Sequence, residues 1–135
     1  MKIVAAIIGM GIGEKHLEAI EHYKKSFVKI ICEKNEKKIK FLKKKYPHKI
    51  ITTNEDVIFK DSSINLVSIA SYDDFHYSQV IKSLKNDKNV IVEKPMCLKL
   101  NQLSEIDKIL KKKKSVKMTS NLVLIWLIKF STKTS

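Results

Sequence analysis

The chain has 135 residues, 44% of them apolar, and carries a formal net charge of +13. This length predicts one domain, and the apolar content is typical of a globular protein rather than a disordered one. All 27 basic residues are lysines. Because arginine is the usual reader of guanine edges and the bidentate clamp on phosphate, its absence argues against a nucleic-acid-binding protein. We interpret the charge as a solvated lysine surface.

Neither the cysteines nor the chain ends indicate secretion or a membrane. Cys32 and Cys97 lack the C-x-x-C spacing and are too few for a disulfide framework, so reduced thiols are expected. The N-terminal apolar run leads into glycines without a small-residue cleavage site, and the run at 122–128 is far shorter than the roughly 20 residues that cross a bilayer. We expect a cytoplasmic protein with no metal site.

Strands and helices are predicted to alternate along the chain. In chain order, the apolar patterns predict a strand at 3–8, a helix over 16–23, a strand at 27–32, a helix at 35–46, a strand at 49–52, a short helix ending at Phe59, a strand at 64–70, a helix at 75–84, a strand at 89–92, a helix at 100–110 and a strand at 116–124. Such alternation implies parallel pairing and right-handed crossovers. The predicted fold class is α/β, a doubly wound, mostly parallel sheet.

All three glycines of the chain stand between the first predicted strand and the first predicted helix, in G-M-G-I-G. Glycine permits the positive φ of a tight turn, and the absence of side chains lets a pyrophosphate approach the backbone amides and the positive end of the helix. The sequence therefore predicts a dinucleotide-binding turn made of Gly9, Met10, Gly11, Ile12 and Gly13.

An acidic residue, Glu33, follows the second predicted strand about 20 residues after the glycines, as a dinucleotide site requires. Its carboxylate would accept hydrogen bonds from the adenosine ribose, and its charge would repel a 2′-phosphate. NAD is thus the predicted cofactor, while Lys34 beside it leaves NADP open.

Three motifs together resemble the Gfo/Idh/MocA family of oxidoreductases, over about residues 2–124. The glycine turn, one residue shorter than G-x-G-x-x-G, is followed by His16 on the first helix. S-Y-D-D-F-H at 71–76 stands where the family has T-P-N-x-x-H, with Ser, Tyr and Asp replacing Thr, Pro and Asn. N-V-I-V-E-K-P at 89–95 contains the most specific family motif, V-x-V-E-K-P, in full.

The resemblance implies roles for these residues. Lys94 would lie near the nicotinamide and orient and polarise a substrate hydroxyl as hydride leaves the carbon. Glu93 would line the cofactor side, the bond before Pro95 could be cis, and Ser71, Tyr72 and His76 would belong to the cofactor-side loop. Without the resemblance, a lone lysine such as Lys94 is usually solvated and His76 is more often a packing residue. The implied substrates are sugars, amino sugars and cyclitols.

The chain departs from the family after residue 124. Family members continue into a second domain that supplies substrate contacts and an acid/base partner, and this chain has no room for it. We divide the chain into a dinucleotide-binding domain at 1–124 and a divergent tail at 125–135, whose preceding apolar run favours self-association.

The missing domain suggests a truncated or frameshifted product, or half of a split enzyme. Such a chain is expected to bind the cofactor with little turnover. Two alternatives remain: a non-catalytic nucleotide-sensing or partner-binding module, and, as a minor candidate, a basic nucleic-acid binder.

Overall fold

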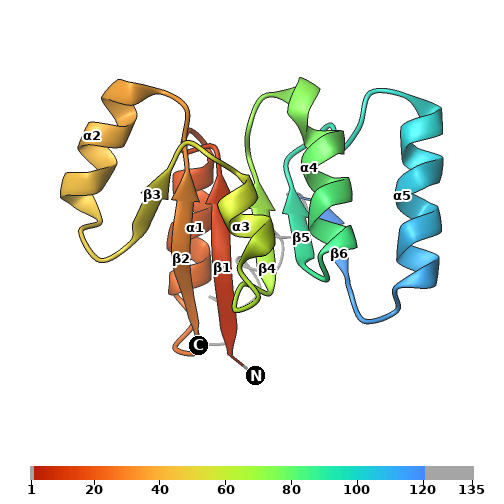
Figure 1. Ribbon diagram of the computed structural model, residues 1–135, viewed down its shortest axis with the longest axis horizontal. Helices are drawn as coiled ribbons and strands as arrows, with labels where there is room; N and C mark the ends of the chain where they lie inside the picture. The colour runs from red at the N-terminus through yellow and green to blue at the C-terminus, as the bar shows by residue number, and fades with distance from the viewer. Residues whose placement is uncertain (1, 121–135) are drawn as a thin grey trace, which may run out of the picture.

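A parallel sheet forms the centre of residues 2–120, the part of the chain that the computed structural model describes (Figure 1). Its strands are β1 (Ile3–Ile8), β2 (Ser26–Cys32), β3 (Ile50–Thr52), β4 (Leu66–Ile69), β5 (Asn89–Val92) and β6 (Met118–Ser120). The helices are α1 (Gly13–Glu21), α2 (Glu36–Lys45), α3 (Asp56–Lys60), α4 (Asp73–Lys85) and α5 (Leu100–Lys112). The six strands lie in the order β3-β2-β1-β4-β5-β6 and each pairs in parallel with its neighbours. The predicted doubly wound α/β sheet is confirmed.

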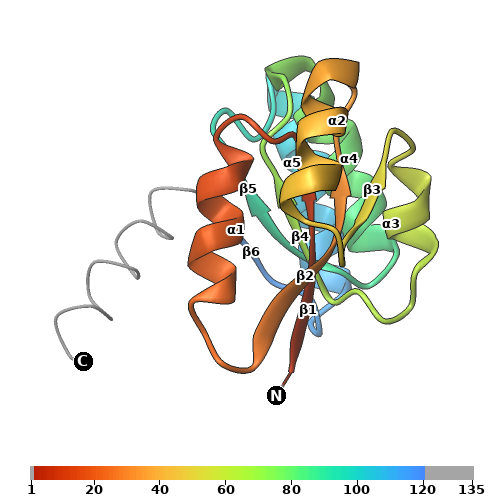
Figure 2. The ribbon, with the colours of Figure 1, turned by 90° about the vertical axis from the view of Figure 1, so that its left-hand side faces the viewer.

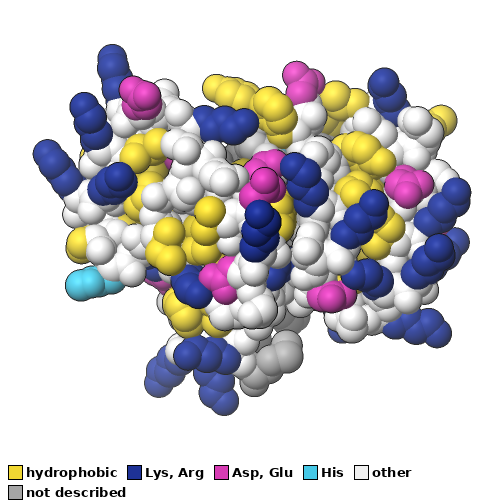
Figure 3. All heavy atoms as spheres, in the orientation of Figure 1, with side chains coloured by type: hydrophobic (Ala, Val, Ile, Leu, Met, Phe, Trp, Pro, Cys, Tyr) yellow, Lys and Arg dark blue, Asp and Glu magenta, His cyan; other side chains and the backbone are white. Residues whose placement is uncertain are grey.

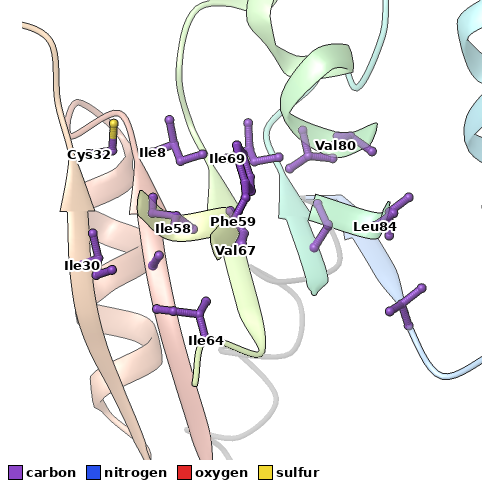
Figure 4. Close-up of a cluster of buried hydrophobic side chains, with 14 of the residues drawn as sticks. Ile8, Ile30, Cys32, Ile58, Phe59, Ile64, Val67, Ile69, Val80 and Leu84 are labelled. Carbon is purple, nitrogen blue, oxygen red and sulfur yellow. The ribbon is translucent and has the colours of Figure 1, made fainter. Parts of the chain in front are cut away.

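Helices cover both faces of the sheet (Figure 2). A hydrophobic cluster on each face holds them in place. Alternate residues of β1 serve the two clusters, Ala5 and Ile7 one face and Ala6 and Ile8 the other. Leu17, Ile20 and Leu42 bring α1 and α2 onto the first face. The second face carries α3, α4 and α5 on a cluster that includes Ile8, Ile30, Cys32, Ile58, Phe59, Ile64, Val67, Ile69, Val80 and Leu84 (Figure 4). Helices on both faces explain why the strands are continuous apolar runs.

Several element boundaries differ from the prediction by one to three residues. α1 ends before Tyr23, which is 47% exposed, and the strand predicted at 64–70 is confined to Leu66–Ile69. The last strand begins at Met118 rather than at 116, and its predicted continuation through 124 and the tail at 125–135 lie outside the described residues.

α5 buries only part of its predicted apolar stripe. Ile106 is buried and Ile109 and Leu110 pack against the core, but Leu100 is 87% exposed and Leu103 is 43% exposed. The physical reason is position along the helix, because the contacts of α5 with the core come from its carboxyl-terminal half. None of the described helices is both long and apolar enough to cross a bilayer.

The strand order reverses between β1 and β4, which are neighbours in the sheet although α1, β2, α2, β3 and α3 separate them in the chain. At such a switch point the connections leave the sheet in opposite directions, and a crevice opens at the carboxyl ends of the two strands. Gly9 follows β1 there and Ala70 follows β4, with the Ala70 N–H bonded to the Ile8 carbonyl at 2.8 Å. The crevice is therefore the place to look for a ligand.

Candidate functional site

The three positions of the turn after β1 that hold glycine do so for different structural reasons. Gly9 has φ +89°, and a Cβ there would stand 2.6 Å from the Ala70 carbonyl oxygen. A Cβ on Gly13 would meet the Ile7 side chain at 2.8 Å, so this glycine lets α1 pack closely on β1. Gly11 is required neither by a positive φ nor by close packing, because a Cβ there would meet nothing within 4 Å. Its bare backbone faces open space and admits the close approach of a ligand.

The amino end of α1 lies directly after this turn. Its N-cap residue, Ile12, provides no side-chain hydrogen bond to the first-turn amides. The first amides of a helix have no intrahelical partner and carry the positive end of the helix dipole. Lys45 and Tyr46 both donate to the carboxylate of Glu14 in the first turn, and the bond from Lys45 is the main reason that the Glu14 pKa is lowered. The turn and the helix end together suit an anion such as a pyrophosphate.

Glu33, at the end of β2, is held against the turn by backbone amides. Its Oε1 accepts from Met10 N at 3.2 Å, and its Oε2 accepts from Lys34 N at 2.7 Å and Asn35 N at 3.1 Å. Burial by itself raises the pKa of Glu33, but these three hydrogen bonds outweigh it and the net pKa is lowered. The carboxylate is thus charged at neutral pH and fixed in direction, ready to accept from a hydroxyl group.

A cleft of about 410 Å³ runs from the glycine turn between the ends of β2 and β4. Of the residues that the sequence predicted for the cofactor, it brings together Gly9, Met10, Gly11, Glu33, Lys34, Ser71 and Tyr72. The other five are outside its lining: Ile12, Gly13, His76, Glu93 and Lys94. Its volume is within the range of small-molecule sites, about 300–1,000 Å³.

His76 holds two loops together beneath the surface. The ring is 1% exposed, with Nδ1 2.7 Å from the Pro95 carbonyl oxygen and Nε2 2.8 Å from the Ser71 carbonyl oxygen. The side chain therefore joins the loop after β4 to the loop after β5. Its position fits the packing role that the sequence left open, and it supports the cleft from below.

Sequence reasoning missed a buried polar chain that links α1 to the E-K-P motif. His16, 3% exposed, places Nδ1 2.5 Å from Ser68 Oγ and Nε2 2.6 Å from Glu93 Oε1. Ser68 is fully buried in β4. The signal in the sequence was a serine inside the apolar run L-V-S-I-A, since a buried hydroxyl calls for a hydrogen-bonding partner. Lys94 comes next along the chain, exposed to solvent, and its bond to Pro95 is cis.

Residues 3–121 match the model of the GFO_IDH_MocA family, described as an oxidoreductase family with an NAD-binding Rossmann fold. The chain belongs to this family. The fold of this chain is similar to that of myo-inositol 2-dehydrogenase from Lactobacillus plantarum. That structure superposes on 90% of this chain with a TM-score of 0.79 and 25% identity, and the match covers 36% of its own chain.

Two further proteins are similar to this chain, one in fold and one in sequence. Scyllo-inositol dehydrogenase from Lactobacillus casei, solved with NAD(H) and scyllo-inositol bound, has a TM-score of 0.80 at 20% identity over 90% of this chain and 36% of its own. The uncharacterized oxidoreductase YhhX of Escherichia coli (strain K12) is 32% identical over 68 residues, which are 50% of this chain and 20% of YhhX. The chain thus spans about a third or less of the length of these relatives.

Proposed function

We propose that this chain binds NAD(H) as the cofactor-binding part of a dehydrogenase that acts on sugars, amino sugars or cyclitols. The observation that carries the proposal is Gly11, whose bare backbone opens onto the cleft without any demand from packing. Membership of a family with an NAD-binding Rossmann fold supports the same cofactor. The substrate class is suggested by the inositol dehydrogenases of similar fold.

The residues divide the work of binding along the cleft. The backbone amides of Gly11, Ile12 and Gly13 would hold the pyrophosphate at the amino end of α1. The amides of Gly9 and Met10 shape the turn instead, because they donate to the Cys32 carbonyl and to Glu33. The fixed carboxylate of Glu33 would accept from a ribose hydroxyl and disfavour a 2′-phosphate, so NAD is preferred to NADP. Ser71 and Tyr72 would line the opposite wall, after β4.

Lys94 would stand at the reaction end of the site. The bound nicotinamide would supply or accept the hydride, and the exposed ammonium group of Lys94 would donate to and orient the substrate hydroxyl or carbonyl oxygen. Glu93, hydrogen-bonded to His16, would keep the end of β5 in place for this role.

We assign the dinucleotide-binding domain to residues 1–124 and the divergent tail to 125–135, and we propose that the protein is cytoplasmic. Substrate contacts would come from a second domain, so the isolated chain is expected to show little turnover.

A titration of the purified chain with NADH and NADPH tests the proposal, followed by cofactor fluorescence and by the shift in thermal midpoint. We expect micromolar binding of NADH, weaker binding of NADPH, and a loss of NADH affinity of at least about tenfold in Gly11→Val, whose side chain would occupy the approach of the pyrophosphate.

The thermal midpoint of Gly11→Val without cofactor is the control for folding. A Cβ at Gly11 would meet nothing within 4 Å, so the thermal midpoint without cofactor should stay close to that of the unchanged chain. A folded chain that binds neither dinucleotide would rule out the proposed function.

A non-catalytic nucleotide-sensing module is the second candidate. It is favoured by the cleft itself, whose lining includes Glu33 but not Glu93 or Lys94. Turnover by this chain supplied with a second domain, compared with that of its Lys94→Ala variant, separates the two roles. NADH binding without any turnover would favour the sensing role, and turnover that Lys94→Ala abolishes while NADH binding is retained would favour the dehydrogenase.

A further inference from the structure

The cleft continues past Glu33 into a compartment with its own polar and aromatic groups. Phe75 is 43% exposed on one wall, and the Lys34 ammonium lies 4.7 Å from the centre of its ring. Glu55, at the amino end of α3, and Gln79, from α4, also line the cleft there. A dinucleotide with its pyrophosphate on the glycine turn and a ribose at Glu33 would place its base in this compartment.

A line of hydrogen bonds fixes the Glu55 carboxylate. Ser71 Oγ donates to Gln79 Oε1 at 2.5 Å, which leaves the Gln79 amide to donate from Nε2 to Glu55 Oε2 at 2.7 Å. Gln79 is only 2% exposed, so the orientation of its amide is set by these partners. Lys82 Nζ donates to Glu55 Oε1 at 3.1 Å from the outer side. A carboxylate can accept about four hydrogen bonds, so these two leave capacity for a ligand.

The charge of Glu55 selects among bases. A carboxylate accepts hydrogen bonds and donates none, so at the 6-position it pairs with the amino group of adenine and is repelled by the oxo group of hypoxanthine or guanine. The N1–H donor of those two bases lies one ring atom away, so the selection depends on Glu55 facing the 6-position. The ring of Phe75 offers a face on which a base can stack. Because every base can stack, this contact adds affinity but does not discriminate between bases. Selection thus falls to Glu55.

We propose that Glu55 is a specificity-determining residue that accepts a hydrogen bond from the adenine amino group of the dinucleotide. The inference rests on the proposed function, because it takes the base from a cofactor bound at the glycine turn. Gln79 and Ser71 act as positioning residues, since they hold the carboxylate through the hydrogen-bonded line.

The test compares NADH with reduced nicotinamide hypoxanthine dinucleotide, which carries oxygen in place of the 6-amino group. The full 135-residue chain should bind NADH at least about tenfold more tightly, because the analogue loses one hydrogen bond and faces the carboxylate with an acceptor. In Glu55→Gln the ratio should fall below about threefold, since an amide can turn either its donor or its acceptor toward the base. Glu36→Gln, the same change at an exposed position on α2, should keep the full ratio.

If Glu55→Gln fails to fold, the affinities of the unchanged chain for NADH and for the hypoxanthine analogue still test the inference. Equal affinities of that chain for the two dinucleotides would overturn the inference and leave the proposed function standing. A tenfold ratio that persists in folded Glu55→Gln would also overturn it, because another group would then read the base. A folded chain that binds neither dinucleotide would overturn the proposed function and the inference together.

Discussion

His16 uses both ring nitrogens inside the protein, one toward Ser68 in β4 and one toward Glu93 at the end of β5. The three side chains come from α1, from β4 and from the residue that follows β5, and the Glu93 side chain is only 13% exposed. A polar group buried without a partner costs about 1–3 kcal/mol, more for a charged one. The ring therefore stabilises the fold by satisfying its neighbours as much as by its own contacts.

Replacing His16 by Ala should lower the free energy of unfolding by about 2–4 kcal/mol, because it removes one hydrogen bond from buried Ser68 and one from Glu93 and opens a small cavity. Urea denaturation at neutral pH measures the change. His22→Ala, at an exposed position just after α1, serves as the matched control and should change stability by less than about 0.5 kcal/mol. Equal stability of the two variants would show that the buried chain contributes nothing.

Residues of the turn were predictable from the sequence, while side-chain networks were not. Gly9, Gly11 and Gly13 stand out because glycine is rare in the chain and its backbone properties are local. The contact of His16 with Glu93 joins residues 77 positions apart, and it exists only once α1, β4 and β5 have packed. No local pattern encodes such a distance, although the family motifs contained both residues. Glu55 likewise meets Gln79 only in the folded molecule.

At the scale of elements, the connection from α3 to β4 is held by a cluster of charged groups. Asp61, the C-cap of α3, accepts from Lys29 Nζ at 2.6 Å and from the Ser63 hydroxyl at 2.6 Å. Lys88, 3% exposed, donates to the carbonyl oxygens of Asp61 and Ile64 at 2.6 and 3.0 Å, and burial lowers its pKa. These bonds fix the backbone between a short helix and a central strand.

The Asp61 pKa predicts a dependence of stability on pH. The bond from Lys29, then that from Ser63, lowers this pKa from 3.8 to about 2. A carboxyl group with a depressed pKa in the folded state stabilises the fold above its unfolded pKa, and the contribution is lost as the pH falls from 3.8 toward 2.

Asp61→Asn should therefore be less stable than the unchanged chain by about 1–2 kcal/mol at pH 7, a value reduced for partial solvent screening, and the gap should narrow at pH 3. Urea denaturation at the two pH values measures it. Asp107→Asn, which removes an exposed partner of Lys111 on α5, should show a small gap at both. A gap for Asp61→Asn that stays constant with pH would contradict the assignment of the effect to this carboxylate.

Element types followed from periodicity, but α5 shows where periodicity stops being informative. Leu100, Leu103 and Ile106 share one stripe in the sequence, yet only Ile106 is buried. Spacing reports which residues share a helix face, not how far along the helix its neighbour extends. The ends of the elements were therefore less predictable than their order.

The whole molecule carries a large excess of positive charge, +13 at neutral pH. Figure 3 shows lysine side chains scattered over one face, at its margins and across its middle, rather than gathered into one continuous patch. Like charges distributed in this way repel one another in the compact state, and the repulsion weakens as salt shortens its range from about 30 Å at 0.01 M to about 10 Å at 0.1 M. The ion pairs among residues 2–120 are mostly on the surface, where each contributes little.

The thermal midpoint of unfolding should therefore rise by about 2–5 °C between 10 mM and 150 mM KCl. The reason is that screening relieves the repulsion between lysines more than it weakens the surface ion pairs. Calorimetry or circular dichroism measures the midpoint. A variant with glutamine at the exposed positions Lys37, Lys40, Lys112 and Lys114 has a net charge lower by four and should shift less. A midpoint that falls with salt would mean that the ion pairs outweigh the repulsion.

The central place of β1 also has a consequence for the chain as it is made. β1 pairs with β2 on one side, but on the other side it must wait for β4, which begins only at Leu66. At synthesis rates of about 5–20 residues per second, the roughly 60 residues between them take about 3–12 s. During that interval a nascent chain on the ribosome presents the apolar edge of β1 without its second neighbour. That half-built sheet, rather than the finished one, is the species in which a chaperone would find an open strand to protect.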